Sequence, residues 1–308
     1  MATFSSYAKN IAYGLFILIM IKPILFNLKK NITEYVQDRT KVGIISLSGP
    51  IMKSSCFVKH LHAFFKDPEI KAIVIKMDSP GGAAGSSQAI YEEIKFCKKK
   101  YPKPVITFVE NICASGGYYI ACTTDHIIAT PSAFMGSIGV YIAYPELKEF
   151  INQCKVTYNI TQAGEYKTIG NPLAGKLTSR QQELLNFVTQ DTYQQFIEDV
   201  SSSRPQLTLA QQKEWAEGKI FTGRQALKLK LIDELGSFSA VEEAVKKHAA
   251  INNEIVWIKR PKKVGMIAQA LGASEEDQDE DDNDSFVGSC INHIMSYLEQ
   301  KTSFGIRT

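Results

Sequence analysis

The chain has 308 residues, which is enough for one large domain or two small ones. Hydrophobic residues make up 44% of it and charged residues 22%, as is ordinary for a globular protein, and the formal net charge is only +3. The sequence contains no basic stripe interleaved with aromatic residues, so we exclude nucleic acid as an expected partner.

An apolar run over residues 11–26, interrupted by Lys22 and Pro23, is the first predicted element. Its uninterrupted part is short for a membrane span and typical of the core of a signal peptide. Lys22 could snorkel to the interface, however, and no small-x-small cleavage site follows the run. We therefore expect an uncleaved membrane anchor over residues 1–28, rather than a cleaved signal or a buried helix, and a polar connector over residues 29–40. Lysines flank the run on both sides, so the positive-inside rule barely decides its orientation.

Strand-like and helix-like segments alternate between residues 41 and 258. The apolar patterns predict strands over residues 41–47, 70–77, 105–109, 126–129, 155–160 and 254–258. Helical spacing predicts helices over residues 55–67, 86–100, 118–122, 145–153, 179–200, 208–217 and 238–250, with a capped helix start at 221–226. This alternation favours an α/β fold with a largely parallel sheet and flanking helices, which we expect to form one domain.

A tail over residues 259–308 follows this domain. Residues 275–284 are nearly all acidic and are interpreted as a disordered linker, and the apolar spacing between residues 291 and 298 suits a short amphipathic helix. Two interpretations stay open: a solvated tail, or a segment that docks on another subunit or near the mouth of the active site.

The most informative stretch is Ala114-Ser115-Gly116-Gly117, which joins a strand-like run to a helix-compatible one. A serine at such a turn presents its hydroxyl, and the amides of the first helical turn have no partner inside the helix. Those amides can hold a developing oxyanion, so Ser115 is a candidate nucleophile. The alternative is an ordinary serine N-cap before a glycine turn.

Two further stretches offer partners for this serine. The adjacent Gly81 and Gly82 follow a strand directly, where a backbone amide can approach a ligand and form half of an oxyanion hole, although an ordinary strand-end turn would look the same. Lys167 lies in a loop over residues 163–175 that glycine and proline punctuate. It is either a surface residue or a buried general base for the serine.

The histidines and cysteines do not supply a competing site in this interpretation. His60 and His62 are two apart on a predicted helix and so share no face, and His126 within a strand is interpreted as structural. The six cysteines form no CxxC pair and match no zinc spacing, so most are expected to be buried packing residues, Cys113 among them. Lysine is then the available base, as in Ser-Lys variants of serine peptidases.

Four motifs follow one another along the chain. They are Ser-Pro-Gly-Gly at 79–82, Ala-Ser-Gly-Gly-Tyr-Tyr at 114–119, Met-Gly-Ser-Ile-Gly-Val at 135–140 and Gly-Glu-Tyr-Lys-Thr-Ile-Gly-Asn-Pro at 164–172. In this order they resemble the motifs of the signal peptide peptidase A family, peptidase family S49, in its short single-copy form. The resemblance covers roughly residues 40–250, with Lys230 where the family commonly has glycine.

The resemblance implies a Clp-protease/crotonase-like fold and assigns roles to five residues. Ser115 would be the nucleophile and Lys167 the general base, while Gly82 and Gly116 would supply the oxyanion amides. Ser137 would orient the lysine. Because a lysine base must be uncharged, we expect Lys167 to be buried in the assembled enzyme.

The resemblance also implies an activity, a class of substrates, an assembly and a cellular location. Residues 41–258 would be a Ser-Lys peptidase domain that hydrolyses remnant signal peptides and other unfolded peptides through an acyl-enzyme, without metal or cofactor. The chain would assemble into a ring or dome, with a site built partly from a neighbouring subunit. It would be anchored in a bacterial membrane, with the catalytic domain outside the cytoplasm. A crotonase-like acyl-CoA enzyme and an inactive membrane-anchored assembly protein are the alternatives.

Overall fold

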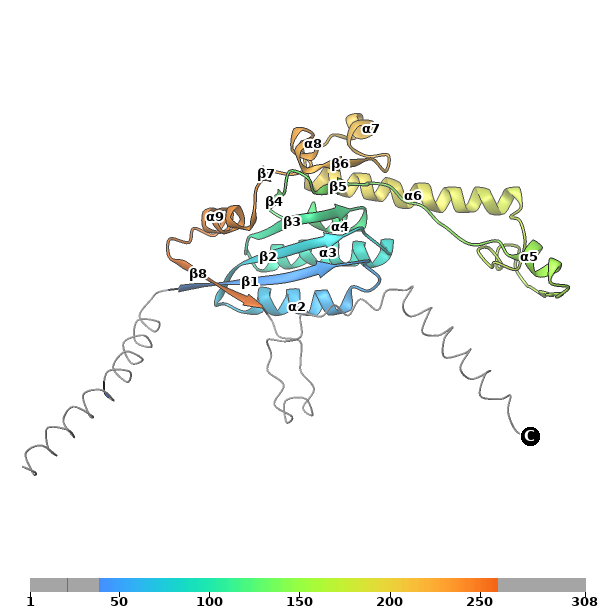
Figure 1. Cartoon of the computed structure of the whole chain (residues 1–308), viewed down its shortest axis with the longest axis horizontal. Helices are drawn as coiled ribbons and strands as arrows, with labels where there is room; N and C mark the ends of the chain where they lie inside the picture. Colours follow the sequence, from blue (N-terminus) through green and yellow to red (C-terminus); the bar gives the residue numbers. More distant parts are fainter. Residues whose placement is uncertain (1–20, 22–38, 260–308) are drawn as a thin grey trace, which may run out of the picture.

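The computed structural model describes residues 39–259, together with Ile21. A mostly parallel sheet lies at its centre (Figure 1). The strands are β1 (Arg39–Ser48), β2 (Ile70–Ser79), β3 (Val105–Ala114), β4 (His126–Ala129), β5 (Phe134–Gly136), β6 (Ile220–Thr222), β7 (Glu234–Leu235) and β8 (Glu254–Lys259). The order across the sheet is β6-β5-β3-β2-β1-β8, with β4 beside β3 and β7 beside β4. Only the β5–β6 pair is antiparallel, so the predicted α/β class and largely parallel sheet are confirmed.

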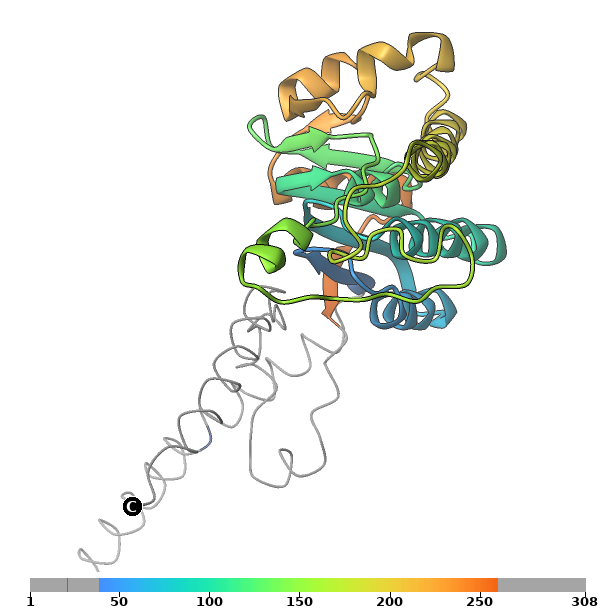
Figure 2. The same cartoon turned by 90° about the vertical axis from the view of Figure 1, so that its right-hand side faces the viewer.

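Helices cover both faces of the sheet. They are α2 (Ser55–Lys66), α3 (Ala84–Lys100), α4 (Gly116–Ala121), α5 (Lys148–Gln153), α6 (Ser179–Ser203), α7 (Gln212–Trp215), α8 (Gly223–Lys228) and α9 (Phe238–His248), with a 3₁₀ turn at Leu209–Gln211. Figure 2 shows α2, α3 and α6 along one side of the sheet, with α6 seen end on. Helix α9 packs on the opposite face.

The alternation of side chains along β2 shows why its sequence is almost continuously apolar. Ile73 and Ile75 point into the larger core, beneath α2, α3 and α4. Ala72 and Val74 point into the smaller core, beneath α9. A strand that is buried on both faces has no solvent side to mark with polar residues.

The loops that follow β1, β2 and β3 meet at the carboxyl edge of the sheet. The Ile51 amide donates to the Gly81 carbonyl oxygen at 2.9 Å, and the Ala83 amide donates to the Ile51 carbonyl oxygen at 2.8 Å. Crevices at the carboxyl ends of parallel strands are where α/β proteins commonly bind ligands.

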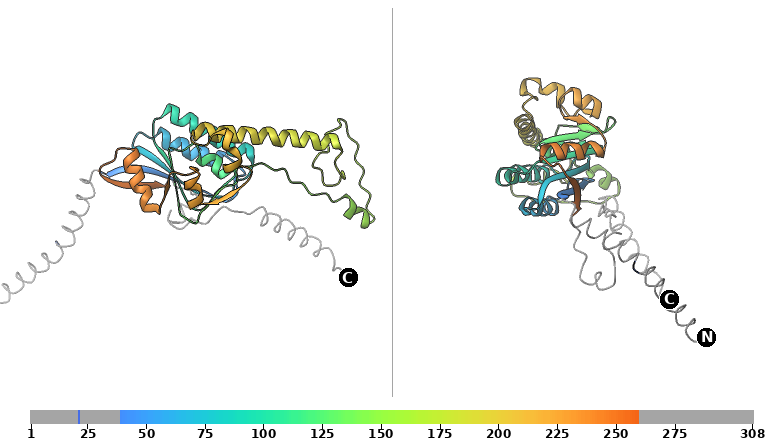
Figure 3. Two further views of the ribbon diagram at one scale, coloured as in Figure 1. Left: turned by 90° about the horizontal axis from the view of Figure 1, so that it is seen from above. Right: turned by 90° about the vertical axis from the view of Figure 1, so that its left-hand side faces the viewer.

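An arm over residues 141–178 extends away from the sheet and returns through α6 (Figures 1 and 3). Thr178 caps α6 in a capping box with Gln181. Only the C-terminal part of this helix is buried, through Phe196, Ile197 and Val200. The strand predicted over residues 155–160 is wrong: these residues form no strand and are exposed. Residues 155–160 have an alternating apolar pattern, but the described part of the arm offers no strand with which they could pair.

The two ends of the described region lie side by side. Arg39 and Thr40 pair with Glu254 and Ile255, so β1 includes two residues that were predicted to belong to the connector. The predicted anchor over residues 1–28 and the acidic linker and terminal helix of the tail lie outside the described residues, Ile21 excepted. Within the described part, no helix combines the length and apolar character that crossing a membrane requires.

Candidate active site

Ser115 occupies a strained turn between β3 and α4. Its backbone has φ 50° and ψ −121°, a region that residues with side chains rarely adopt. The turn is fixed from both sides, because the Ser115 amide donates to the Gly136 carbonyl oxygen at 2.7 Å and its own carbonyl oxygen accepts from the Tyr119 amide at 2.9 Å. The half-buried side chain makes no capping hydrogen bond. Ser115 thus stands at the N-cap position of α4, as the alternative interpretation expected, but its side chain does not cap the helix in the described part of the chain.

The loop after β2 lies directly against this turn. A methyl group added at Gly81 would lie 2.8 Å from the Ser115 Cβ and 2.7 Å from the Gly116 nitrogen. A methyl group added at Gly116 would lie 3.4 Å from the Gly82 nitrogen. The two glycines chosen from the sequence as oxyanion donors, Gly82 and Gly116, are thus neighbours in space and flank the serine.

Neither of these two glycine amides is used by the fold. Among the described residues, we find no acceptor bonded to the amide of Gly82 or of Gly116. Glycine is required at Gly82, since a methyl group there would lie 2.3 Å from the Ile51 carbonyl oxygen, and it is favoured at Gly116, where a methyl group would lie 2.2 Å from the Ser87 Oγ. Two unpaired amides beside a projecting hydroxyl are the geometry that an oxyanion hole needs.

A second layer of hydrogen bonds holds the β2 loop in place. The Ser79 Oγ donates to the Gly49 carbonyl oxygen at 2.6 Å and accepts from the Gly81 amide at 3.1 Å. Ser79 and Ser87 are fully buried. The sequence analysis missed the supporting roles of Ile51 and Ser87, and their positions close after β1 and within the first turn of α3 were the available signal.

Ser137 also lies at this edge. It follows β5 directly, has φ 51°, and its amide donates to the Lys219 carbonyl oxygen at 2.7 Å. The preceding residue, Gly136, is the one whose carbonyl oxygen accepts from Ser115. Ser137, which is half-buried, is thus one residue away from a direct backbone partner of Ser115.

Lys167 is not brought to the serine within one chain. Its loop is tied to the start of α6, where the Gln181 Nε2 donates to the Glu165 carbonyl oxygen at 3.0 Å. The Ser115 turn lies near the other end of α6, because Tyr119 of α4 stacks on Phe196 of α6, with ring centroids 4.4 Å apart. Gln181 and Phe196 are separated by about 22 Å along α6, at roughly 1.5 Å per residue. Lys167 is exposed on the arm.

The other candidate nucleophiles and bases near the turn are occupied or buried. Cys113 is fully buried, and burial raises the pKa of its thiol far above the ordinary value, so it is no rival to the serine. His126 bonds to Glu234 at 3.1 Å and packs against His248, in agreement with a structural role. Of the five described cysteines, Cys97, Cys113 and Cys122 are buried, as expected for most of them, whereas Cys56 and Cys154 are exposed.

The arm and α6 expose an unusual amount of apolar surface. Tyr141 on the arm is 86% exposed and Phe187 on α6 is 71% exposed. Ile142, Phe150, Tyr158, Leu184 and Val188 add to this surface, which we call the arm patch. Large apolar side chains left exposed on neighbouring stretches of chain are candidates for an interaction surface.

Two family models match the chain. The model described as peptidase family S49 matches residues 97–252, and the model described as Clp protease matches residues 29–135. The first covers β3, the Ser115 turn and the whole arm, and the second covers β1 to β4 and ends within β5. The fold is thus Clp-protease-like.

Several known proteins are similar in sequence. A putative protease of Synechocystis sp. is 34% identical over 69% of this chain and 74% of its own length. A putative signal peptide peptidase SppA of Enterococcus faecium is 29% identical over 70% of this chain and 62% of its own length. The chloroplastic serine protease SPPA of Arabidopsis thaliana is 29% identical over 68% of this chain, but the match spans only 30% of that longer protein.

Proposed function

We propose that this chain, which belongs to peptidase family S49 and is a serine peptidase, cleaves peptide bonds with a dyad of Ser115 and Lys167. The observation that carries the proposal is the strained Ser115 turn beside two glycine amides that find no acceptor among residues 39–259. The crotonase-like acyl-CoA enzyme and the inactive assembly protein are set aside, because family membership favours peptide hydrolysis over both.

In the proposed mechanism, the Ser115 Oγ attacks the peptide carbonyl carbon while the Lys167 amine takes the hydroxyl proton. The amides of Gly82 and Gly116 donate to the oxyanion that forms, and Ser137 orients the lysine. The lysine then gives its proton to the leaving amine, which produces an acyl-enzyme. Water, deprotonated by the same lysine, attacks the ester, and the lysine returns that proton to the Ser115 Oγ as the acid product leaves. The residues proposed for these steps require no cofactor.

We propose further that Lys167 reaches Ser115 from a neighbouring subunit of a ring or dome. The separation of the two residues along α6 leaves the serine without this lysine inside its own chain. The lysine lies on the projecting arm, and the arm patch provides the apolar surface that assembly would cover. Closing that interface would also bury Lys167, as an uncharged amine requires.

Remnant signal peptides and other unfolded peptides are the proposed substrates. The name of the Enterococcus faecium relative supports this class, and a site on loops at an open sheet edge suits an extended chain. We assign peptidase activity to residues 41–258 and leave the tail, residues 259–308, outside it. The apolar run supports a proposed N-terminal anchor over residues 1–28. The family resemblance, and not the flanking charges, is the basis for proposing that the catalytic domain lies outside a bacterial cytoplasm.

Mixing two inactive variants tests both the dyad and its origin. We expect Ser115→Ala and Lys167→Ala each to abolish hydrolysis of a fluorogenic unfolded peptide. Co-assembled from unfolded or dissociated subunits, the two variants should regain part of the activity, because some neighbours then combine an intact serine with an intact lysine.

Lys176→Ala is the matched control, since Lys176 is another exposed lysine of the same arm, paired with Glu149 at 3.6 Å. It should keep wild-type activity. Full activity in Lys167→Ala would reject the dyad, whereas loss in both single variants without recovery on mixing would reject only the contribution from a neighbour.

A further inference from the structure

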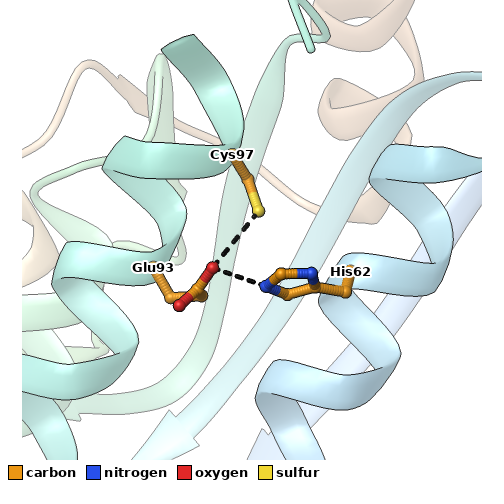
Figure 4. Close-up of side chains that lie close together, drawn as sticks. All are labelled: His62, Glu93 and Cys97. Atoms are coloured by element: carbon orange, nitrogen blue, oxygen red, sulfur yellow. Dashed lines mark hydrogen bonds and ion pairs between the residues drawn. The ribbon is translucent and has the colours of Figure 1, made fainter. Parts of the chain in front are cut away.

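A second group of reactive side chains lies away from the serine, between α2 and α3. His62 comes from α2, and Glu93 and Cys97 come from α3 (Figure 4). The His62 Nε2 lies 2.5 Å from the Glu93 Oε1, and the Cys97 Sγ lies 3.7 Å from the same oxygen. The three potential ligand atoms all lie within 4.8 Å of one another. One nitrogen, one oxygen and one sulfur therefore converge from two helices.

The cluster sits where the buried helix interface meets the surface. The side chains of His62 and Glu93 are 29% and 28% exposed, whereas Cys97 is fully buried. A dissolved ion can therefore reach the nitrogen and the oxygen, while the sulfur closes the site from below. Lys66 and Lys100 are the cations near Cys97, and both are exposed, so water screens their repulsion of a bound cation.

We propose that His62, Glu93 and Cys97 form a binding site for Zn²⁺ or a similar divalent transition metal. Imidazole nitrogen, thiolate sulfur and carboxylate oxygen are the ligands that zinc takes in proteins. Glu93 and Cys97 are four residues apart, which puts both on one face of α3, and His62 faces them from the adjacent helix. Three protein ligands with a solvent-facing side would leave a fourth position for water.

The distances suit such a site after small side-chain rotations. Ligand atoms around a tetrahedral zinc ion lie roughly 3.3–3.7 Å apart, given bonds of about 2.0–2.3 Å. The sulfur–oxygen separation already has this value. The histidine nitrogen lies within 4.8 Å of the sulfur and would have to come into the same range. The histidine and the carboxylate would have to separate by about 0.8 Å, exchanging their mutual hydrogen bond for bonds to the metal.

Binding would change the protonation of the cluster. Burial, together with Glu93, raises the pKa of the Cys97 thiol to about 11, so the thiol is protonated in the metal-free protein. Metal binding would form a metal–sulfur bond and release the thiol proton to solvent. A divalent ion bound to one thiolate, one carboxylate and one neutral imidazole has no net charge, which suits a half-buried position.

The site would act on the fold rather than on the peptide. It would link the C-terminal halves of α2 and α3, while the first residues of α3 follow Gly82 and pack Ser87 against Gly116. A metal that binds only the folded chain stabilises it by mass action. The sequence analysis missed this cluster because His62 was compared with His60, whereas its partners lie about thirty residues further along the chain.

Cobalt provides the test, because Co²⁺ bound by a thiolate absorbs through sulfur-to-metal charge transfer, and tetrahedral Co²⁺ gives intense visible bands. The full-length chain, freed of metal by a chelator, would be titrated with Co²⁺ and then with Zn²⁺. We expect a charge-transfer band that saturates at one ion per chain and disappears when Zn²⁺ displaces Co²⁺. The melting temperature should rise with Zn²⁺.

Variants assign the band to the cluster. Cys97→Ser and His62→Gln should abolish the charge-transfer band or weaken affinity by more than the about 10–100-fold that the loss of an outer-shell partner costs. Cys56→Ser and His60→Gln, which alter the exposed thiol and the other histidine of α2, should change neither the band nor the affinity.

Two outcomes would overturn the proposal: no thiolate band with Co²⁺ in the folded wild type, or a band that persists in Cys97→Ser and disappears in Cys56→Ser. Equal metal-free melting temperatures of wild type and Cys97→Ser would show that lost binding does not reflect a lost fold. The Ser115→Ala variant should bind metal normally, so the site can be tested even if the proposed dyad fails.

Discussion

Gly116 shows most directly how single residues hold the Ser115 turn. It stands between the serine and the opposing loop, with Ser87 of α3 beneath it. The sequence alone predicted a strand-to-helix turn at Ser115, and the structure confirms that turn. The sequence could not show that the Gly82 loop closes against that turn, because the contact depends on the pairing of distant strands.

Replacing Gly116 by alanine tests the amide pair. The added methyl group would lie 2.2 Å from the Ser87 Oγ and 3.0 Å from its Cβ. The Ser87 hydroxyl would have to rotate away from the Ala83 carbonyl oxygen, to which it donates, and we expect the remaining crowding to shift the Gly116 amide. We expect kcat for peptide hydrolysis to fall by about 10²-fold or more, the cost of losing one oxyanion donor. Gly85→Ala, where nothing lies within 4 Å of the added carbon, is the control and should remain active.

Circular dichroism and the assembly state of Gly116→Ala would be measured alongside its activity. Ser87→Ala in the same chain removes the closest atom and should restore part of kcat. Wild-type activity in Gly116→Ala alone would contradict the assignment of its amide to the oxyanion.

Predicted helices and strands formed where the local sequence signal was accompanied by a packing or pairing partner in the fold. The predicted start of α8 is confirmed, with Thr222 and Gln225 forming a capping box. The predicted strand at residues 155–160 had a local pattern but no partner strand, and it does not form. Helix α6 extends three residues beyond its predicted end at residue 200, with Val200 still buried against the core.

The packing of α9 against β4 predicts a dependence of stability on pH. Burial, followed by the nearby His126, lowers the pKa of His248 below its ordinary value of 6.5, and Lys247 acts in the same direction, against Asp125 and Asp233. The unfolded chain therefore binds this proton more readily than the folded one. Its contribution to stability is present above pH 6.5 and is lost as the pH falls through the lowered pKa.

Urea unfolding of wild type and His248→Gln at about pH 7.5 and about pH 5.5 would measure this effect, on either side of the ordinary histidine pKa. The difference in unfolding free energy between the two pH values should be smaller in the variant. His60→Gln is the control histidine and should retain the wild-type difference. An unchanged difference in His248→Gln would rule out this residue as the source.

At the scale of the whole molecule, the separation of Ser115 and Lys167 is the main feature that the sequence motifs could not predict. Both were chosen from the sequence as one dyad, yet the arm carries the lysine to the far end of α6. Motif order along a chain says which residues occur, but it does not say whether the same copy brings them together. The proposed assembly therefore has to provide what a single chain lacks.

The arm patch predicts how that assembly would respond to a charge. Phe187 is 71% exposed on α6, and Phe187→Asp would place a carboxylate in any apolar interface formed there. We expect light scattering to show smaller particles and peptide hydrolysis to fall with them. Phe96→Asp, at a 56% exposed site on α3, should change neither. An unaltered particle mass in Phe187→Asp would move the interface away from this patch.

Because β1, β2 and β3 are parallel, the start of β1 and the Ser115 turn lie at opposite ends of the sheet. The chain enters β1 at Arg39, beside the first residue of β8, whereas the Ser115 turn lies at the opposite edge. Ten residues of extended strand span about 33 Å. If the residues before Arg39 hold the chain on a surface, the edge of the sheet that carries Ser115 would lie at a distance from that surface. Peptides lying flat on that surface would then be out of reach of Ser115, and only those with a free end long enough to cross the gap would be cut.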